Sequence, residues 1–162
     1  MMTPPLTVRH AGMEDIPAVA ELFDQYRQFY KQPPDLPRAQ RFIADRISRG
    51  ESVILCACRQ QHKPATEREA GHSLLGFCQL YPSFCSVEAT EIFVLYDLFI
   101  SPASRGSGAG KALLLAAEQE ARRRNIKRID LSTAHTNTRA QALYEALGWE
   151  PDREFRVYSK II

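Results

Sequence analysis

A run with three closely spaced glycines constrains the fold of this chain more than any other sequence feature. Residues 97–100 are mainly apolar, as expected for a strand, and a helical pattern begins near Gly108, within a run that holds Gly106, Gly108 and Gly110. Glycine lets the backbone approach an anion without obstruction from a side chain, and a helix start adds unpaired N–H groups and the positive end of the dipole. The sequence therefore predicts a strand, a turn and a helix that together can bind a phosphate group.

Two well-known phosphate-binding loops do not fit this run. A P-loop requires a glycine five positions before the Gly-Lys pair and a Ser or Thr after it, whereas Arg105 and Ala112 occupy those positions around Gly110 and Lys111. The dinucleotide pattern Gly-x-Gly-x-x-Gly would need its last glycine at position 111. We therefore expect neither a P-loop NTPase nor a dinucleotide-binding Rossmann protein.

Composition indicates one domain with no polyanionic or membrane partner. The 162 residues are 44% hydrophobic and 25% charged, which is enough for one substantial core, and the net charge is only +2. The basic residues within 122–128 are expected at the solvated end of a helix, where cations complement the dipole. The chain has no apolar run of about 18 residues and no leader-like N-terminus. We expect a soluble, unexported domain over 1–162 in the cytoplasm.

The four cysteines predict thiols without a metal or a disulfide. Cys56, Cys58, Cys78 and Cys85 lie in or beside apolar, strand-like segments, and none forms a Cys-x-x-Cys pair or has a histidine at zinc spacing. We interpret them as buried, reduced thiols, which suits a cytoplasmic address and requires no metal.

Hydrophobic periodicity predicts alternating strands and helices. We expect the polar segment 60–72 to be a hairpin loop rather than a domain boundary, because strand character resumes after it. The predicted strands are 6–9, 52–59, 74–81, 92–100 and 128–132, with a closing pair around Trp149 and 155–160; the predicted helices are 16–30, 38–48, 110–124 and 138–147. This order predicts an α/β fold.

Two motifs in order carry a family resemblance. The first is R-x-x-G-x-G at 105–110, and the second is N-x-x-A-x-x-x-Y-x-x-x-G-W at 137–149. Together they resemble the pyrophosphate loop and the following helical segment of the GNAT superfamily of acetyl-CoA-dependent N-acetyltransferases. The resemblance covers the chain from about Gly76 to Lys160, and more loosely the two helices before it.

The resemblance implies a specific form of the α/β fold. In the GNAT fold, a mixed, mostly antiparallel sheet of about six to seven strands has helices on both faces. The strands that correspond to 92–100 and 128–132 splay apart at the centre of the sheet, and the pantetheine arm of the coenzyme lies between them. A bulge near Asp97 would account for the splay.

The resemblance also implies acetyl-CoA as co-substrate, with no metal. The backbone of residues 98–100 would pair with pantetheine as an additional strand, and the basic residues near 122–128 could add a contact to the coenzyme 3′-phosphate. Asn137 would cap a helix and contact the pantetheine amide. The predicted cofactor-binding residues are Leu98, Phe99, Ile100, Arg105, Gly106, Ser107, Gly108, Ala109, Gly110, Lys111, Asn137 and Tyr144.

Tyr144 is the predicted general acid. It follows Asn137 by seven residues, nearly two helical turns, so both side chains project from one face. A tyrosine at helical spacing among apolar residues can simply belong to the core. In this family, however, the matching tyrosine donates a proton to the departing thiolate, and the resemblance implies the same role for Tyr144.

Asp97 is the second predicted catalytic residue. It interrupts an apolar strand, where an unpaired carboxylate would cost several kcal/mol, so it needs a partner. That partner is either structural, an arginine or a backbone donor, or the ammonium group of a substrate. The segments 95–99 and 140–144 resemble the histone and polyamine acetyltransferase branch, in which such a carboxylate could accept the amine proton. Glu88 and Glu91 are alternative bases or solvated residues.

These assignments predict direct transfer of an acetyl group to a primary amine, such as a polyamine, a lysine-like amine or a small amine. A backbone N–H near Phe99 would stabilise the oxyanion, and Tyr30, Tyr81 and Asp97 would bind the acceptor, with further aromatic residues as walls. Transfer of a longer acyl group and a catalytically silent CoA-binding module are the alternatives. We expect a small-molecule or lysine-type amine as partner, no nucleic acid or membrane, and a chain that can form a homodimer.

Overall fold

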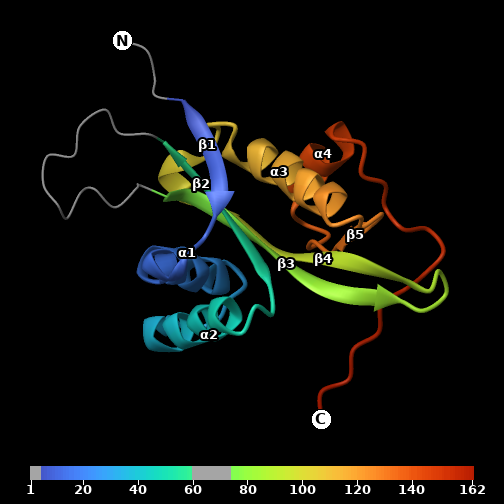
Figure 1. Cartoon of the computed structure of the whole chain (residues 1–162), viewed down its shortest axis with the longest axis horizontal. Helices are drawn as coiled ribbons and strands as arrows, with labels where there is room; N and C mark the ends of the chain where they lie inside the picture. Colours follow the sequence, from blue (N-terminus) through green and yellow to red (C-terminus); the bar gives the residue numbers. More distant parts are fainter. Residues whose placement is uncertain (1–4, 60–73) are drawn as a thin grey trace, which may run out of the picture. The chain divides into compact units, whose positions relative to one another are not determined.

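The computed structural model describes residues 5–59 and 74–162 of the chain (Figure 1). The predicted loop at 60–72 lies outside these described residues. The chain divides into two compact units, Met1–Ser132 and Thr133–Ile162, and each is described by itself.

The first unit contains a mixed sheet of five strands in the order β1-β2-β3-β4-β5. Neighbours among the first four strands are antiparallel, and β5 runs parallel to β4. The strands are β1 Leu6–His10, β2 Val53–Arg59, β3 Leu74–Cys85, β4 Thr90–Ile100 and β5 Ile129–Leu131. The predicted α/β architecture with a mostly antiparallel sheet is confirmed.

Three helices of the first unit cover the sheet, with α1 and α2 side by side on one face and α3 on the other (Figure 1). Two of the helix starts have a local cause: Pro17 lies in the first turn of α1, and the Asp35 side chain caps α2 by accepting from the N–H of Arg38 at 3.0 Å. The helices are α1 Ile16–Phe29, α2 Leu36–Ser48 and α3 Ala109–Arg123, with short 3₁₀ turns at Met13–Asp15 and Pro102–Ser104.

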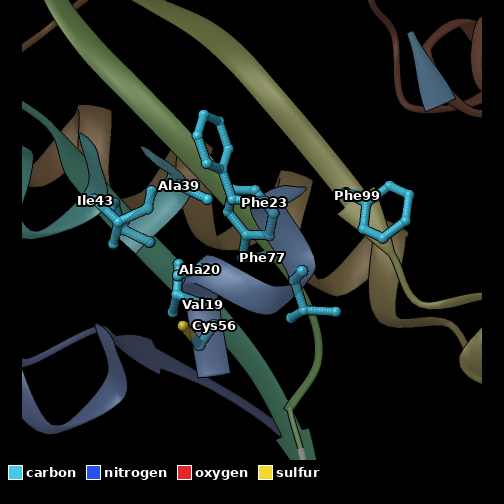
Figure 2. Packing of buried hydrophobic residues seen from close by; sticks show 10 residues of the cluster. Val19, Ala20, Phe23, Ala39, Ile43, Cys56, Phe77 and Phe99 are labelled. Atoms are coloured by element: carbon cyan, nitrogen blue, oxygen red, sulfur yellow. The ribbon is translucent and has the colours of Figure 1, made fainter. Parts of the chain in front are cut away.

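Helices on both faces explain why β2 is apolar throughout. Six of its seven residues are buried, which is the pattern of a strand covered on both sides. Figure 2 shows the core on the α1 and α2 face, where Phe23 of α1 meets Phe77 of β3 edge to face at 6.4 Å between ring centroids. Ile43 and Cys56, both fully buried, join the same cluster.

The predicted closing strands around Trp149 and at 155–160 were wrong, because no strand forms after α4 (Thr138–Ala146) in the second unit. Asp152 Oδ1 accepts hydrogen bonds from the N–H groups of Glu154 and Phe155, at 2.8 and 2.9 Å. This turn engages the N–H of Phe155, the first residue of the predicted strand 155–160. The described residues therefore form five strands instead of six to seven.

The basic run after α3 is neutralised locally. Arg123 and Arg124 donate to the nearly buried carboxylate of Glu120 at 2.8 and 2.6 Å, and His10 of β1 lies 3.2 Å from it. Burial raises the pKa of Glu120, but the hydrogen bonds from the two arginines and His10 outweigh it and hold the pKa at about 2. Glu120 thereby ties the end of α3 to β1.

All four cysteines carry free thiols. Cys56, Cys58 and Cys78 are buried, as predicted, whereas Cys85 at the end of β3 is half-buried. Burial raises the pKa of the Cys56 thiol to about 12, so this group is uncharged at neutral pH. Among the helices in the described part of the chain, none combines the length and the hydrophobicity needed to cross a bilayer.

Gly76 is required by the close approach of β3 to β4. A Cβ atom added there would collide with the carbonyl oxygen of Phe99 and the side chain of Ile100. We therefore expect Gly76→Ala to lower the free energy of unfolding by about 1–3 kcal/mol, measured by chemical denaturation. Gly12→Ala is the control, because its added Cβ meets only the flexible Glu14 side chain. Equal losses in both variants would contradict crowding against β4.

Candidate active site

A β-bulge in β4 organises the site. Gln79 of β3 lies opposite Asp97, whereas the next residue, Leu80, lies opposite Leu95, so Tyr96 is an extra residue in β4. Such an insertion reverses which residues of a strand face each side of the sheet. The bulge lies beside Asp97, where the family resemblance placed it.

The reversal is visible in two phenylalanines of β4. Before the bulge, Phe93 lies under the guanidinium of Arg124 at the end of α3, 5.8 Å from the ring centroid. After the bulge, Phe99 belongs to the core beneath α1 and α2. Asp97, two residues before Phe99, therefore also faces α1.

One edge of β4 is open beyond the bulge. The parallel strand β5 pairs only with Phe93, Val94 and Leu95. Within the described residues, β4 continues to Ile100 with no strand beside it on that edge. This is the splay between the two strands that the family resemblance implied.

Strand alternation determines which backbone groups line the open edge. The N–H of Ser101 donates to the carbonyl of Leu75 on β3 at 2.9 Å. Because alternate residues direct their N–H and C=O groups to opposite edges, Phe99 also directs its groups to β3, whereas Leu98 and Ile100 direct theirs to the open edge. Of the three predicted pantetheine-pairing residues, Leu98 and Ile100 have the backbone orientation needed.

The glycine-rich loop has the geometry of an anion-binding turn. Gly106 and Gly108 adopt left-handed conformations, with φ of 82° and 85°, and an added Cβ at either would meet no atom within 4 Å. The N–H groups of Gly106, Gly108 and Gly110 donate to no acceptor among the described residues. Arg105 and Lys111, both exposed, add positive charge at either end of the loop. These features can bind a diphosphate through the backbone.

Asp97 is held in a buried polar network. The carboxylate is 2% exposed, and the side-chain amide of Gln79 donates to its Oδ2 at 2.5 Å. Burial raises the pKa of Asp97 to about 6, against the lowering effect of the hydrogen bond from Gln79 and of the nearby Tyr26 hydroxyl. Asp97 is thus ionised at neutral pH yet can accept a proton there. Its partners are an amide and a phenol, whereas the structural alternatives considered from the sequence were an arginine or a backbone donor.

Tyrosine rings surround Asp97. Tyr81 packs edge-on against Tyr96, 5.8 Å between centroids, and both burial and the charge of Asp97 raise the pKa of Tyr81. On α1, Tyr26 donates its hydroxyl to the Tyr96 carbonyl at 3.1 Å and packs edge-on against Tyr30 at 5.1 Å. Of the predicted acceptor-binding residues, Tyr81 therefore neighbours Asp97 directly, and Tyr30 is linked to it through Tyr26.

Sequence analysis did not identify Gln79 and Ser52 as site residues. The Ser52 hydroxyl donates to Gln79 Oε1 at 2.7 Å, and Gln79 is fully buried. A signal was present, because Gln79 is the lone polar residue of the apolar segment 74–81, as Asp97 is of 92–100. Two buried polar side chains in neighbouring strands of a hairpin are expected to satisfy each other.

The second unit contains the remaining predicted site residues. Asn137 caps α4, because its Oδ1 accepts from the N–H of Ala140 at 3.4 Å. The Tyr144 ring lies against Trp149, with centroids 6.0 Å apart, and is half-buried. The seven-residue spacing of Asn137 and Tyr144 places these two side chains on one face of α4.

The other acidic candidates lie at the surface. Glu88 pairs with Arg128 at 2.8 Å in the turn after β3, and Glu91 is exposed at the start of β4. Within residues 5–59 and 74–162, no cluster of acidic, histidine or cysteine side chains could hold a metal ion.

Comparison with known families explains this arrangement. The model of the Acetyltransferase (GNAT) family matches residues 16–149, which include the bulged strand, the glycine-rich loop and α4. The chain belongs to the GNAT family of acetyltransferases. It is 41% identical over 153 residues to a protein named "Uncharacterized N-acetyltransferase YhfO" from Bacillus subtilis (strain 168), covering 94% of this chain and 95% of that protein. The protein is therefore an acyltransferase enzyme.

Solved structures share the GNAT fold. A crystal structure described as "a probable acetyltransferase" is 33% identical, with a TM-score of 0.83 over 96% of this chain and 97% of that one. A predicted acetyltransferase from Clostridium acetobutylicum, crystallised with acetyl-CoA, is 16% identical, with a TM-score of 0.69 over 96% of each chain. At that low identity the second similarity concerns the fold alone.

Proposed function

We propose that this GNAT acetyltransferase is an N-acetyltransferase that transfers the acetyl group of acetyl-CoA directly to a basic primary amine of polyamine, lysine-like or small-amine type. The observation that carries the proposal is the buried carboxylate of Asp97, next to the open edge of β4 and surrounded by tyrosines. A carboxylate of this kind attracts an ammonium group, and aromatic faces stabilise the same cation.

The residues of the first unit fit acetyl-CoA. Leu98 and Ile100 offer unpaired backbone groups to the amides of pantetheine, as an adjacent strand would. The open N–H groups of Gly106, Gly108 and Gly110 suit the pyrophosphate, with charge from Arg105 and Lys111. GNAT acetyltransferases use acetyl-CoA, and the Clostridium structure contains it. Asn137 and Tyr144 complete the proposed set of coenzyme contacts.

Asp97 and Tyr144 carry out different proton transfers: Asp97 deprotonates the substrate ammonium, and Tyr144 protonates the departing sulfur. Asp97 accepts one proton from the substrate ammonium and passes it to solvent, which leaves a neutral amine. The amine nitrogen then bonds to the thioester carbonyl carbon, and a backbone N–H at the open edge, from Leu98 or Ile100, stabilises the oxyanion. As the carbon–sulfur bond breaks, Tyr144 protonates the sulfur and regains a proton from the nitrogen through solvent. The products are an amide, a free thiol and one proton.

An acceptor panel tests the proposed reaction. Free-thiol release from acetyl-CoA would be measured with aliphatic diamines, lysine-like amines and weakly basic arylamines. We expect the aliphatic amines, which arrive charged, to react with the highest kcat/KM. Faster reaction of arylamines would contradict the assignment of a cationic acceptor, and faster reaction of longer acyl-CoA thioesters would contradict acetyl as the transferred group.

Gly108→Asp should remove coenzyme binding. The substitution adds a negative side chain where the pyrophosphate would lie, on a backbone with φ of 85°. We expect saturating acetyl-CoA to raise the melting temperature of the parent protein but not of this variant. Gly50→Asp is the matched control, since Gly50 is also left-handed, with φ of 61° and open space around it, but lies after α2. An undiminished shift in Gly108→Asp would place the coenzyme elsewhere.

A further inference from the structure

Three side chains form a hydrogen-bonded row across the sheet. Ser52, just before β2, donates to Gln79 Oε1 on β3 at 2.7 Å, and Gln79 Nε2 donates to Asp97 on β4. The row lies on the α1 face, because Gln79 is two residues from Phe77 and Asp97 is two residues from Phe99, both in the core on that face. The mechanism above assigns a role to Asp97 alone.

The chemistry of the three groups fixes the orientation of the Gln79 amide. An ionised carboxylate can only accept hydrogen bonds, so the amide must direct its NH₂ group to Asp97 and its oxygen away from it. The hydroxyl of Ser52 donates to that oxygen and so satisfies it. Gln79 is fully buried, and water therefore cannot replace either contact.

We propose that Gln79, oriented by Ser52, is a positioning residue for acetyl transfer that holds one oxygen of Asp97 in place and favours its ionised, proton-accepting form. This inference rests on the proposed role of Asp97 as the base. Without the amide, Asp97 would have the Tyr26 phenol nearby, whose hydroxyl donates to the Tyr96 carbonyl, and its charge would lie in a largely apolar site. A larger fraction of the carboxyl group would then be protonated at neutral pH, and that fraction could not accept a proton from the substrate.

Among the described neighbours of this row, Asp97 is the group with a pKa near neutral, about 6. Burial raises the pKa of Tyr26, Tyr81 and Cys78 far above this range. The charged neighbour on α2, Arg46, acts on Tyr81 and pairs with Glu51 at 2.7 Å. The described side chains around Asp97 on the α1 face are Tyr26 of α1 and Gln79 and Tyr81 of β3, with Tyr96 next to it in β4 and Arg46 of α2 beyond Tyr81; Cys78 of β3 lies on the opposite face of the sheet.

Two substitutions test the proposal through the pH dependence of kcat/KM. Gln79→Leu keeps the approximate volume but removes the donor, so the apparent pKa of the acidic limb should rise by about one unit or more above about 6. kcat/KM at pH 7 should then fall about twofold for a one-unit rise and about tenfold for a two-unit rise, and recover at higher pH. Ser52→Ala should also raise the apparent pKa of the acidic limb, but by a smaller amount, because the Gln79 amide keeps its contact with Asp97 and loses only its orienting partner.

Ser52→Thr is the matched control. It retains the hydroxyl and should restore the parent pH profile, which a merely structural role of Ser52 does not predict. Ser52→Ala also keeps the test valid if Gln79→Leu fails to fold, since Ser52 lies outside the strand and is only half-buried. Equal rate losses at every pH in Gln79→Leu and Ser52→Ala, with no shift of the limb, would overturn the proposal.

Direct titration separates this proposal from the catalytic role of Asp97. The carboxyl carbon of Asp97 can be followed by NMR in protein with ¹³C-labelled aspartate, and the signal absent from Asp97→Asn assigns it. A titration that moves upward in Gln79→Leu supports the effect of Gln79 on the ionisation of Asp97, whereas an active Asp97→Asn refutes Asp97 as the base and with it the link to acetyl transfer. An unmoved titration in both variants, together with an inactive Asp97→Asn, overturns the positioning role and leaves the proposed function standing.

Discussion

Replacement of Asp97 by asparagine is expected to lower kcat/KM for a basic primary amine by roughly 10²- to 10⁴-fold, the usual range for loss of one acid–base group. The amide can still accept a hydrogen bond from Gln79, so the strand should keep its shape and coenzyme binding should persist. The loss should be larger for diamines and lysine-like amines than for weakly basic arylamines, because only the former arrive charged. Steady-state kinetics on both amine classes measures the difference.

The same substitution should stabilise the fold at neutral pH. Asp97 has a pKa of about 6 in the folded protein, against an ordinary value of 3.8, so the folded state binds the proton more tightly. An acid with a raised pKa loses stability as pH rises through this interval, and at pH 7 the buried charge costs on the order of 3 kcal/mol. Asp97→Asn avoids that cost. Its melting temperature should exceed that of the parent at pH 7 by roughly 6–12 °C and approach it near pH 4.

Glu91→Gln is the control for the Asp97 variant, since it makes the same chemical change at an exposed position of β4. It should alter neither activity nor the pH dependence of stability. Equal losses on charged and uncharged amines would refute the ammonium-binding role of Asp97. A lower melting temperature at pH 7 would instead identify the carboxylate as a structural group.

Tyr144→Phe should lower kcat by roughly tenfold to several thousandfold while leaving acetyl-CoA affinity nearly unchanged. The ring, which lies against Trp149 with centroids 6.0 Å apart, keeps its packing, and only the hydroxyl proposed to protonate the leaving thiolate is removed. Single-turnover kinetics with a basic amine would measure the chemical step, and the thermal shift with acetyl-CoA would measure binding.

Tyr158→Phe provides the comparison for this second variant, because Tyr158 belongs to the same unit and its side chain is 87% exposed. Its turnover should be that of the parent protein. If Tyr144→Phe also turned over at the parent rate, Tyr144 would be a packing residue and another group or water would protonate the thiolate.

The first unit was predictable because its signals are local. Periodicity placed α1 within one residue of its observed bounds, and the two motifs identified the family before any geometry was known. The prediction of closing strands was wrong because a strand needs a pairing edge as well as a local pattern. The alternation within 155–160 resembles a strand, but the turn at Asp152 engages the N–H of Phe155 instead.

The partners of Asp97 could not be derived from its own strand. The sequence implied that a buried carboxylate needs a donor, and this requirement was met by Gln79 and Tyr26, at separations of 18 and 71 positions along the chain. Which residue lies opposite Asp97 depends on the register of β3 against β4, and that register shifts at the bulge. A hydrophobic pattern does not locate a bulge here, because tyrosine is common in regular strands and nothing in the sequence marks Tyr96 as an extra residue.

The extra residue at Tyr96 gives β4 one residue more than its pairing with β3 requires. The half of the strand before it is in one phase, with Phe93 beneath Arg124, and the half after it is in the opposite phase, with Phe99 in the α1 core. Removal of Tyr96 would leave Leu95 opposite Leu80 and Asp97 opposite Gln79, so both halves could keep their partners and their faces in a regular ladder. What the strand would lose is the bend and added twist that a bulge introduces, at the point where β5 stops pairing with it. Substitution at position 96 thus preserves the course of β4 through the site, whereas deletion there would straighten it.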